Sequence, residues 1–107
     1  MVEEHEKRKR IMEDYLKAKG YSLQKEKLQY AGHTCDIIAK KGKEKLCIVV
    51  EVDNNFKDKK TKWEALSGNR EWNFCLFIKE SNFEKIKQLL EEWSIYYKTT
   101  YTYKNGS

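Results

Sequence analysis

The sequence predicts one α/β domain over residues 1–107, with a mixed four-stranded sheet flanked by helices. Three observations support this fold class. Apolar residues recur at helical spacing in three segments, and short apolar runs lie between these segments. A glycine-containing turn joins two of the runs, which predicts an antiparallel pair. A helical segment separates two buried runs, which predicts a parallel pair. The expected order is α-β-β-β-α-β-α, with an extra C-terminal strand as an option.

The first two predicted elements are a helix and a strand. Residues 2–19 predict an amphipathic helix, and Gly20 follows as a natural stop. Residues 21–30 alternate loosely between apolar and polar side chains, which predicts a strand, and Gly32 marks its end. The helical stripe of the first segment consists of Ile11, Met12, Tyr15 and Leu16.

Residues 35–40 and 45–53 predict a β-hairpin. Gly42-Lys43 fits a two-residue type II′ turn, which requires glycine at its first central position. This turn would place Asp36 opposite Val49. A three-residue loop with a bulge is the alternative, and it would move Asp36 to the other face of the sheet.

The second half of the chain predicts two more helices and two more strands. Residues 55–67 predict a helix that Gly68 ends, and residues 74–78 predict a buried strand parallel to the hairpin's second arm. A capping box, with Ser81 as the N-cap and a glutamate three residues later, predicts the start of a helix. Residues 95–103 alternate tyrosine and threonine, which predicts an edge strand.

Three acidic residues stand at the open end of the predicted hairpin. Side chains alternate along a strand, so the register places Asp36 and Glu51 diagonally on one face, with Cβ atoms roughly 5–8 Å apart. Asp53 is expected on the same face. One bound cation could bridge such carboxylates, and hard oxygen ligands suit Mg²⁺ or Mn²⁺ better than Zn²⁺. Each acid alone could instead end a strand or cap the next helix.

The order of these predicted elements resembles that of the PD-(D/E)XK nuclease superfamily. The order is an early helix, an aspartate in a strand meander, a Glu-x-Asp on the next strand, then a helix and a strand. This superfamily includes restriction endonucleases and archaeal Holliday-junction resolvases. The resemblance covers about residues 5–93. It implies a restriction-endonuclease-like core, metal ligation by Asp36 and Glu51, and the Val52 carbonyl as an additional ligand. It also implies that a glutamate of the first helix can face the metal, for which Glu6 is the nearest candidate.

The sequence departs from the superfamily pattern at two positions. Cys35 stands where the motif has proline, and Asp53 stands where it has lysine. Some members carry such a residue and supply the cation from the following helix. Helical spacing from Phe56 favours Lys60 as this cation, with Lys59 second. Lysines on such a stretch are more often part of a solvated helix face than a catalytic group.

The predicted function is that of a divalent-metal-dependent endonuclease that hydrolyses DNA phosphodiester bonds. In this hypothesis Asp36 and Glu51 hold Mg²⁺ or Mn²⁺, Asp53 is a third ligand or holds a water, and Lys60 orients the nucleophile or phosphate. The alternative is a catalytically inactive nuclease-fold module that binds nucleic acid or a protein. A subunit of a larger restriction or repair complex is a third option.

Charge and composition point to the partners. Lys and Arg outnumber Asp and Glu by 22 to 17, a net charge of +5, which suits a polyanion such as DNA. No run is long enough for a membrane span, so an intracellular location is expected, cytoplasmic or at the nucleoid, with a viral or plasmid origin open. The predicted edge strand could pair with a second copy to give a homodimer.

The three cysteines, Cys35, Cys47 and Cys75, fit no standard zinc spacing. Cys47 and Cys75 lie in apolar runs, which predicts reduced core residues.

Overall fold

The structure, a computed structural model, describes residues 3–25 and 29–104. A five-stranded sheet lies at its centre, in the order β1-β4-β5-β6-β7. β4 is antiparallel to both β1 and β5, whereas β5, β6 and β7 run parallel. The fold is therefore α/β with a mixed sheet, and its fifth strand, β7, is the extra C-terminal strand that the sequence offered as an option. These strands are Ser22–Leu23, Ile37–Lys41, Glu44–Val50, Asn73–Lys79 and Thr99–Tyr103.

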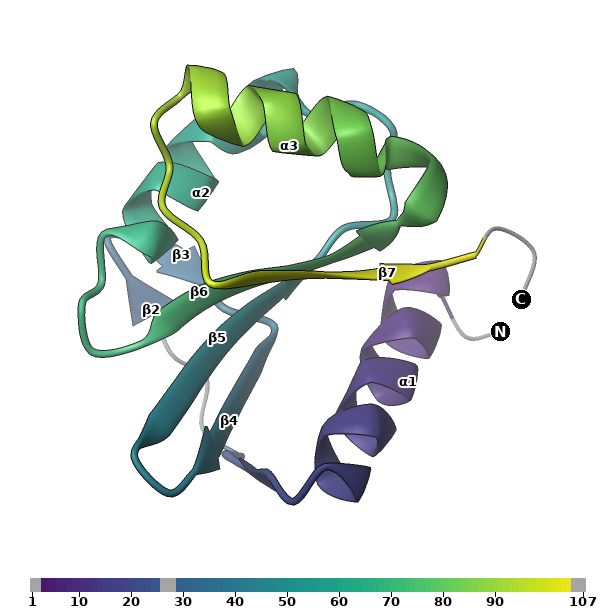
Figure 1. The fold of residues 1–107 in the computed structure, drawn as a ribbon, viewed down its shortest axis with the longest axis vertical. Coiled ribbons are helices and arrows are strands. Elements are labelled where there is room, and N and C mark those ends of the chain that lie inside the picture. Colours follow the sequence, from purple (N-terminus) through teal and green to yellow (C-terminus); the bar gives the residue numbers. More distant parts are fainter. Residues whose placement is uncertain (1–2, 26–28, 105–107) are drawn as a thin grey trace.

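Helices cover both faces of the sheet (Figure 1). α1, Glu4–Ala18, lies on one face, and α2, Lys60–Ser67, and α3, Phe83–Glu92, lie on the other. Side chains alternate along β5, so this strand contributes to both cores. Ile48 packs in the cluster that contains Leu16 of α1. Val49 packs in the cluster that contains Trp63 of α2.

The predicted hairpin register is confirmed. Ile37 pairs with Ile48 and Lys41 pairs with Glu44, which leaves Gly42 and Lys43 as the two central residues of the turn. Gly42 adopts φ 59°, and Lys43 has no positive φ, as a type II′ turn requires. Continued by one step, this register places Asp36 opposite Val49.

The single strand predicted over residues 21–30 is wrong. β1 ends at Leu23, and β2, Gln29–Tyr30, pairs with β3, His33–Thr34, in a separate two-stranded sheet. Residues 26–28 lie outside the described part of the chain. Ala31 (φ 52°) and Gly32 (φ 81°) form a tight turn with two positive φ angles, as in a type I′ hairpin. The four residues directly after β1, at positions 24–27, are all polar or charged, so they offer the main sheet no apolar side chain.

Two helix starts differ from the sequence prediction. A 3₁₀ turn over Lys57–Lys59 precedes α2, and another over Glu80–Asn82 precedes α3. α3 therefore begins at Phe83 with Asn82 as its N-cap, so the start predicted at Ser81 is too early. The predicted stop of α2 is confirmed, because Gly68 is its C-cap.

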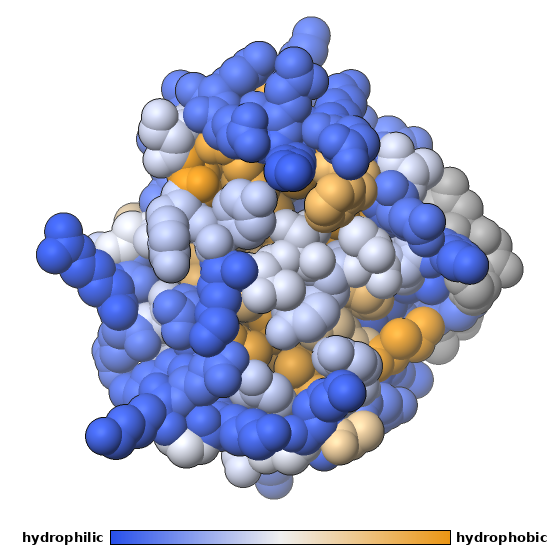
Figure 2. Space-filling view, in the orientation of Figure 1, coloured by the Kyte–Doolittle hydropathy of each residue, from blue (hydrophilic) through white to orange (hydrophobic). Residues whose placement is uncertain are grey.

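β7 is an edge strand, as predicted, although it begins at Thr99 rather than at residue 95. It carries no charged residue over Thr99–Tyr103. Figure 2 shows a paler surface along β7, between α3 and α1, while strongly hydrophilic side chains cover much of the surrounding rim. Pairing of this edge with a second copy stays a prediction.

Candidate functional site

The two acids that the hairpin was predicted to bring together lie at one end of the strands, which we call the carboxyl edge of the sheet because the parallel strands β5, β6 and β7 end there. Glu51 directly follows β5, and Asp36 directly precedes β4. Because these strands are antiparallel, the end of one lies beside the start of the other. The carboxyl ends of β6 and β7 lie at the same edge, since both run parallel to β5. The carboxyl edge of parallel strands is a frequent place for ligand sites in α/β folds.

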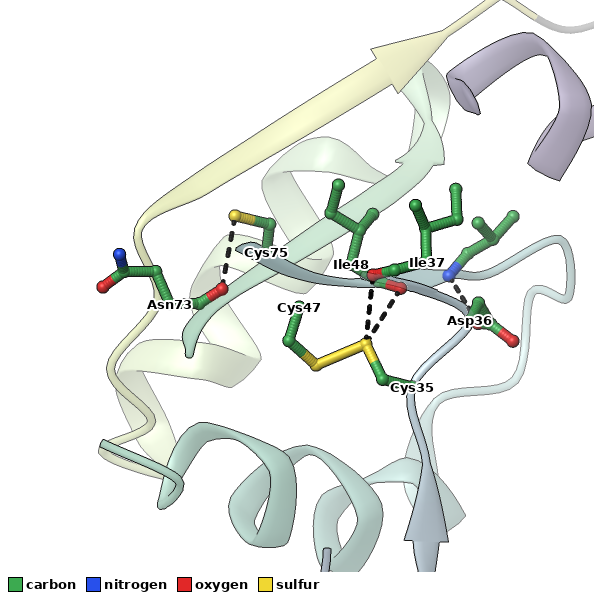
Figure 3. Close-up of a disulfide and its surroundings, with 8 residues drawn as sticks. Cys35, Asp36, Ile37, Cys47, Ile48, Asn73 and Cys75 are labelled. Atoms are coloured by element: carbon green, nitrogen blue, oxygen red, sulfur yellow. Dashed lines mark hydrogen bonds between the residues drawn. A yellow bond between two sulfur atoms is a disulfide. The ribbon is translucent and has the colours of Figure 1, made fainter. Parts of the chain in front are cut away.

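Asp36 is held by two contacts. The backbone N–H of Val50 donates to its Oδ2 at 2.8 Å, and His5 Nε2 of α1 lies 3.3 Å from its Oδ1. The β4–β5 ladder ends at Ile37, so the carboxylate replaces a backbone carbonyl as the acceptor for Val50. Figure 3 shows the Asp36 side chain directed toward that backbone nitrogen. Asp36 is therefore fixed next to the residue that precedes Glu51.

Glu51 is a buried carboxylate, with 5% of its surface exposed. The Trp63 indole Nε1–H donates to Oε2 at 2.8 Å, and Lys59 Nζ lies 3.7 Å from Oε1. Burial raises the pKa of Glu51, and the negative charge of Asp36 raises it further, whereas Lys59, the Trp63 hydrogen bond and Lys62 lower it. Asp36 is held by His5 of α1 and Glu51 by Trp63 of α2, so the two acids are contacted from opposite faces of the sheet, and the charge of Asp36 is the smallest of these contributions to the pKa of Glu51.

The main chain of Glu51 is fixed as well. Its N–H donates to the Phe77 carbonyl at 3.0 Å, and its own carbonyl accepts a hydrogen bond from the Tyr103 hydroxyl at 3.2 Å. The guanidinium of Arg8, which is 4% exposed, lies 4.1 Å from the centre of the Tyr103 ring. Arg8 Nε also donates to Glu4 Oε1 at 2.7 Å. Helix α1 and strand β7 thus both support the backbone at this acid.

The structure places a different lysine at the site from the one the sequence favoured. Lys59 reaches Glu51, whereas Lys60 is exposed and lies 3.7 Å from Glu64 on the outer side of α2. The 3₁₀ turn before α2 explains this reversal. It winds three residues per turn rather than 3.6, so it shifts the phase assumed from Phe56.

Asp53 does not join the two acids. β5 ends at Val50, so strand alternation no longer controls the direction of Asp53, which is exposed. Its charge acts instead on Tyr103, whose pKa is raised chiefly by burial. Within residues 3–25 and 29–104, no three His, Cys, Asp or Glu side chains are grouped so that they could hold a metal ion.

The other sequence candidates have mixed outcomes. Val52 is partly buried and packs against the α1 side of the core. Glu6 is exposed on α1, and its neighbour His5 contacts Asp36 instead. The sequence analysis gave Trp63, His5 and Arg8 no role at the acids. The position of the tryptophan on the helix after Glu51 was the one sequence feature that could have predicted its contact with this acid.

The cysteine prediction is wrong for Cys47, which forms a disulfide with Cys35 (Figure 3). The chain bends at Asp36, so Cys35 packs in the same apolar cluster as Cys47. Their Cα atoms are 6.0 Å apart, a separation common in disulfides. Cys75 is free and buried, as predicted, and burial raises the pKa of its thiol to about 11. The disulfide removes two of the three cysteines as zinc ligands.

The donor set that remains fits a hard divalent cation. Asp36 and Glu51 supply carboxylate oxygens, and each oxygen keeps one further lone pair beyond its present contact. Magnesium is commonly held by one or two protein carboxylates, with water and substrate phosphate completing its shell. Two carboxylates are therefore enough for such a site, although three were expected.

Comparison with protein-family models, with curated proteins and with solved structures gives no match for this chain. None of the helices in the described part of the chain is both long enough and apolar enough to cross a membrane.

The disulfide predicts the number of reactive thiols. Unfolded without reductant, the protein should expose one thiol to a thiol reagent, and three after reduction. Replacing Cys47 with serine should lower the free energy of unfolding by about 3 kcal/mol. The cross-link closes the loop between residues 35 and 47, and a loop of that size restricts the unfolded chain by about this much. Cys75→Ser is the control and should leave a single cross-link. Three reactive thiols before reduction would refute the disulfide.

Burial of Glu51 predicts a pH-dependent stability change. The folded state favours the protonated carboxyl, so the wild type should lose stability as pH rises from the ordinary carboxyl pKa through the raised one. Glu51→Gln keeps an acceptor for Trp63 and should be more stable by about 1 kcal/mol at pH 8, with a smaller gain at pH 5. Urea unfolding at both pH values measures this gain. Glu64→Gln, in an exposed pair, is the control, and a gain independent of pH would contradict the argument.

Proposed function

We propose that this protein is a divalent-metal-dependent endonuclease that hydrolyses DNA phosphodiester bonds. The proposal includes membership of the PD-(D/E)XK superfamily and a restriction-endonuclease-like fold for the α/β core. It is supported mainly by one observation. A buried glutamate and an aspartate fixed by a backbone N–H lie at the same end of the sheet, with a lysine beside the glutamate.

The burial of Glu51 favours a functional reading over a structural one. A glutamate almost never lies in a core without a partner, and keeping it charged there costs free energy. The fold does not need the charge, because Trp63 could donate to an uncharged amide equally well. Acids whose pKa is shifted by burial are concentrated in functional sites.

Each residue has a defined role in this proposal. Asp36 and Glu51 would hold Mg²⁺ or Mn²⁺, which when bound lowers the pKa of a water and neutralises charge on the phosphate. Trp63 positions the Glu51 carboxylate, and His5 positions Asp36. Lys59, rather than Lys60, would contact the scissile phosphate or the attacking water. Asp53 could still hold a water of the outer shell, which stays a prediction.

The second candidate is a nuclease-fold module that binds nucleic acid or a protein without cutting. The observation that favours it is the position of Asp53, which is exposed and apart from the other acids. Such a module would keep the basic surface and lose metal-dependent cleavage.

Substitution of the aspartate separates the two candidates. Asp36→Asn should lower cleavage of supercoiled and branched DNA in Mg²⁺ or Mn²⁺ by about 100-fold or more, because one of two metal ligands is lost. Titration calorimetry should show weaker Mn²⁺ binding to the same variant. Asp14→Asn, on the exposed side of α1, is the matched control. Cleavage by Asp36→Asn at the wild-type rate would refute the site. DNA binding without cleavage in the wild type would favour the inactive module.

The two neighbouring lysines provide a matched pair. Lys59→Ala should lower cleavage by roughly 100-fold, since one donor to the developing phosphate charge is typically worth this much. Lys60→Ala removes the same charge from the outer side of α2 and should have little effect. Single-turnover rates at saturating metal measure both. Equal losses would show that only overall charge matters.

A further inference from the structure

A cleft of about 450 Å³ opens directly beside Asp36, on the α1 side of the site. One wall is helix α1, and the other is the end of β1 together with the start of β4. Lys9 and Lys17 line the helix wall, and Lys25 lines the opposite wall. None of these lysines forms an ion pair with any residue of the described ranges. Their charges are therefore available to a ligand.

The cleft extends away from the site along one stripe of α1. His5, Lys9, Glu13 and Lys17 are spaced four residues apart, so each neighbours the next along a ridge that winds gradually around the helix. His5 contacts Asp36 at one end of this stripe. Twelve residues of helix separate it from Lys17, a length of about 18 Å. A ligand in the cleft would thus lead to Asp36 from one direction.

The composition of the cleft selects a slender polyanion. Positive side chains on both walls suit a chain of phosphates between them, and the partly exposed Leu23 offers apolar surface for a base or sugar. The volume is typical of a small-molecule pocket. A duplex presents phosphates on two strands across grooves roughly 6–12 Å wide, and a cleft of this volume cannot enclose it. A single unpaired strand fits both the positive charge on the two walls and the limited volume of the cleft.

From this cleft we infer that the protein binds single-stranded nucleic acid, with its backbone between Lys9, Lys17 and Lys25 and one phosphate delivered to Asp36. The inference rests on the proposed function, because it names the form of substrate for that site. Glu13, which also lines the cleft, opposes phosphate and weakens the interaction. The preferred substrates are strand ends, flaps and gaps rather than continuous duplex.

The test measures binding without metal, by fluorescence anisotropy of a labelled oligothymidylate and a duplex of the same length. The single strand should bind more tightly than the duplex, with a log–log salt slope of about −2 for three lysine contacts. The triple variant Lys9→Gln/Lys17→Gln/Lys25→Gln should lose most of this slope and bind several-fold more weakly. Glu13→Gln should bind more tightly. The matched control is Lys43→Gln/Lys85→Gln/Lys87→Gln, whose lysines are exposed outside the cleft.

The outcomes separate this inference from the nuclease proposal. Equal loss in both triple variants, or equal affinity for duplex and single strand, would overturn the cleft as a single-strand site. If the cleft variants alone lose binding and the wild type never cleaves, the cleft stands and the nuclease proposal fails. If metal-dependent cleavage is present and the cleft variants leave it unchanged, the nuclease proposal stands and the cleft inference fails.

Discussion

The side chain of Glu51 lies at the carboxyl end of β5, almost out of contact with water, and the elements around it compensate for its burial. Helix α2 supplies the indole of Trp63 and the cation of Lys59. β6 and β7 hold its backbone through Phe77 and Tyr103. A buried carboxylate with fewer partners would lower the stability of the folded state considerably. α2 and β7 thus supply the protein groups that replace water around this acid.

This arrangement also keeps the acid in place before any ligand arrives. Trp63 is itself fully buried and packs against Phe56 and Trp93, with ring centres about 6 Å apart. A hydrogen bond from a locked side chain fixes the carboxylate orientation, and groups that are already oriented need no reorganisation when charge develops nearby. Asp36 is fixed from the other side of the sheet through His5.

Local chemistry determined which parts could be predicted from sequence. The Gly42-Lys43 turn sets the strand register, so the position of Asp36 opposite Val49, at the same end of the sheet as Glu51, was predictable. Strand alternation failed for Asp53 because the strand had already ended. Helical spacing failed for Lys59 and Lys60 because a 3₁₀ turn changed the phase. The contact between His5 and Asp36 spans 31 positions and depends on how α1 packs, which no local pattern encodes.

The contacts of α1 and β7 with the two acids have a practical consequence for anyone who purifies this protein. His5 touches Asp36 and Tyr103 touches the backbone of Glu51, so residues close to either terminus border the same edge of the sheet. A polyhistidine affinity tag at either end would bring additional imidazoles within reach of the carboxylates. Metal titrations and cleavage assays should therefore use protein from which the tag has been removed by proteolysis.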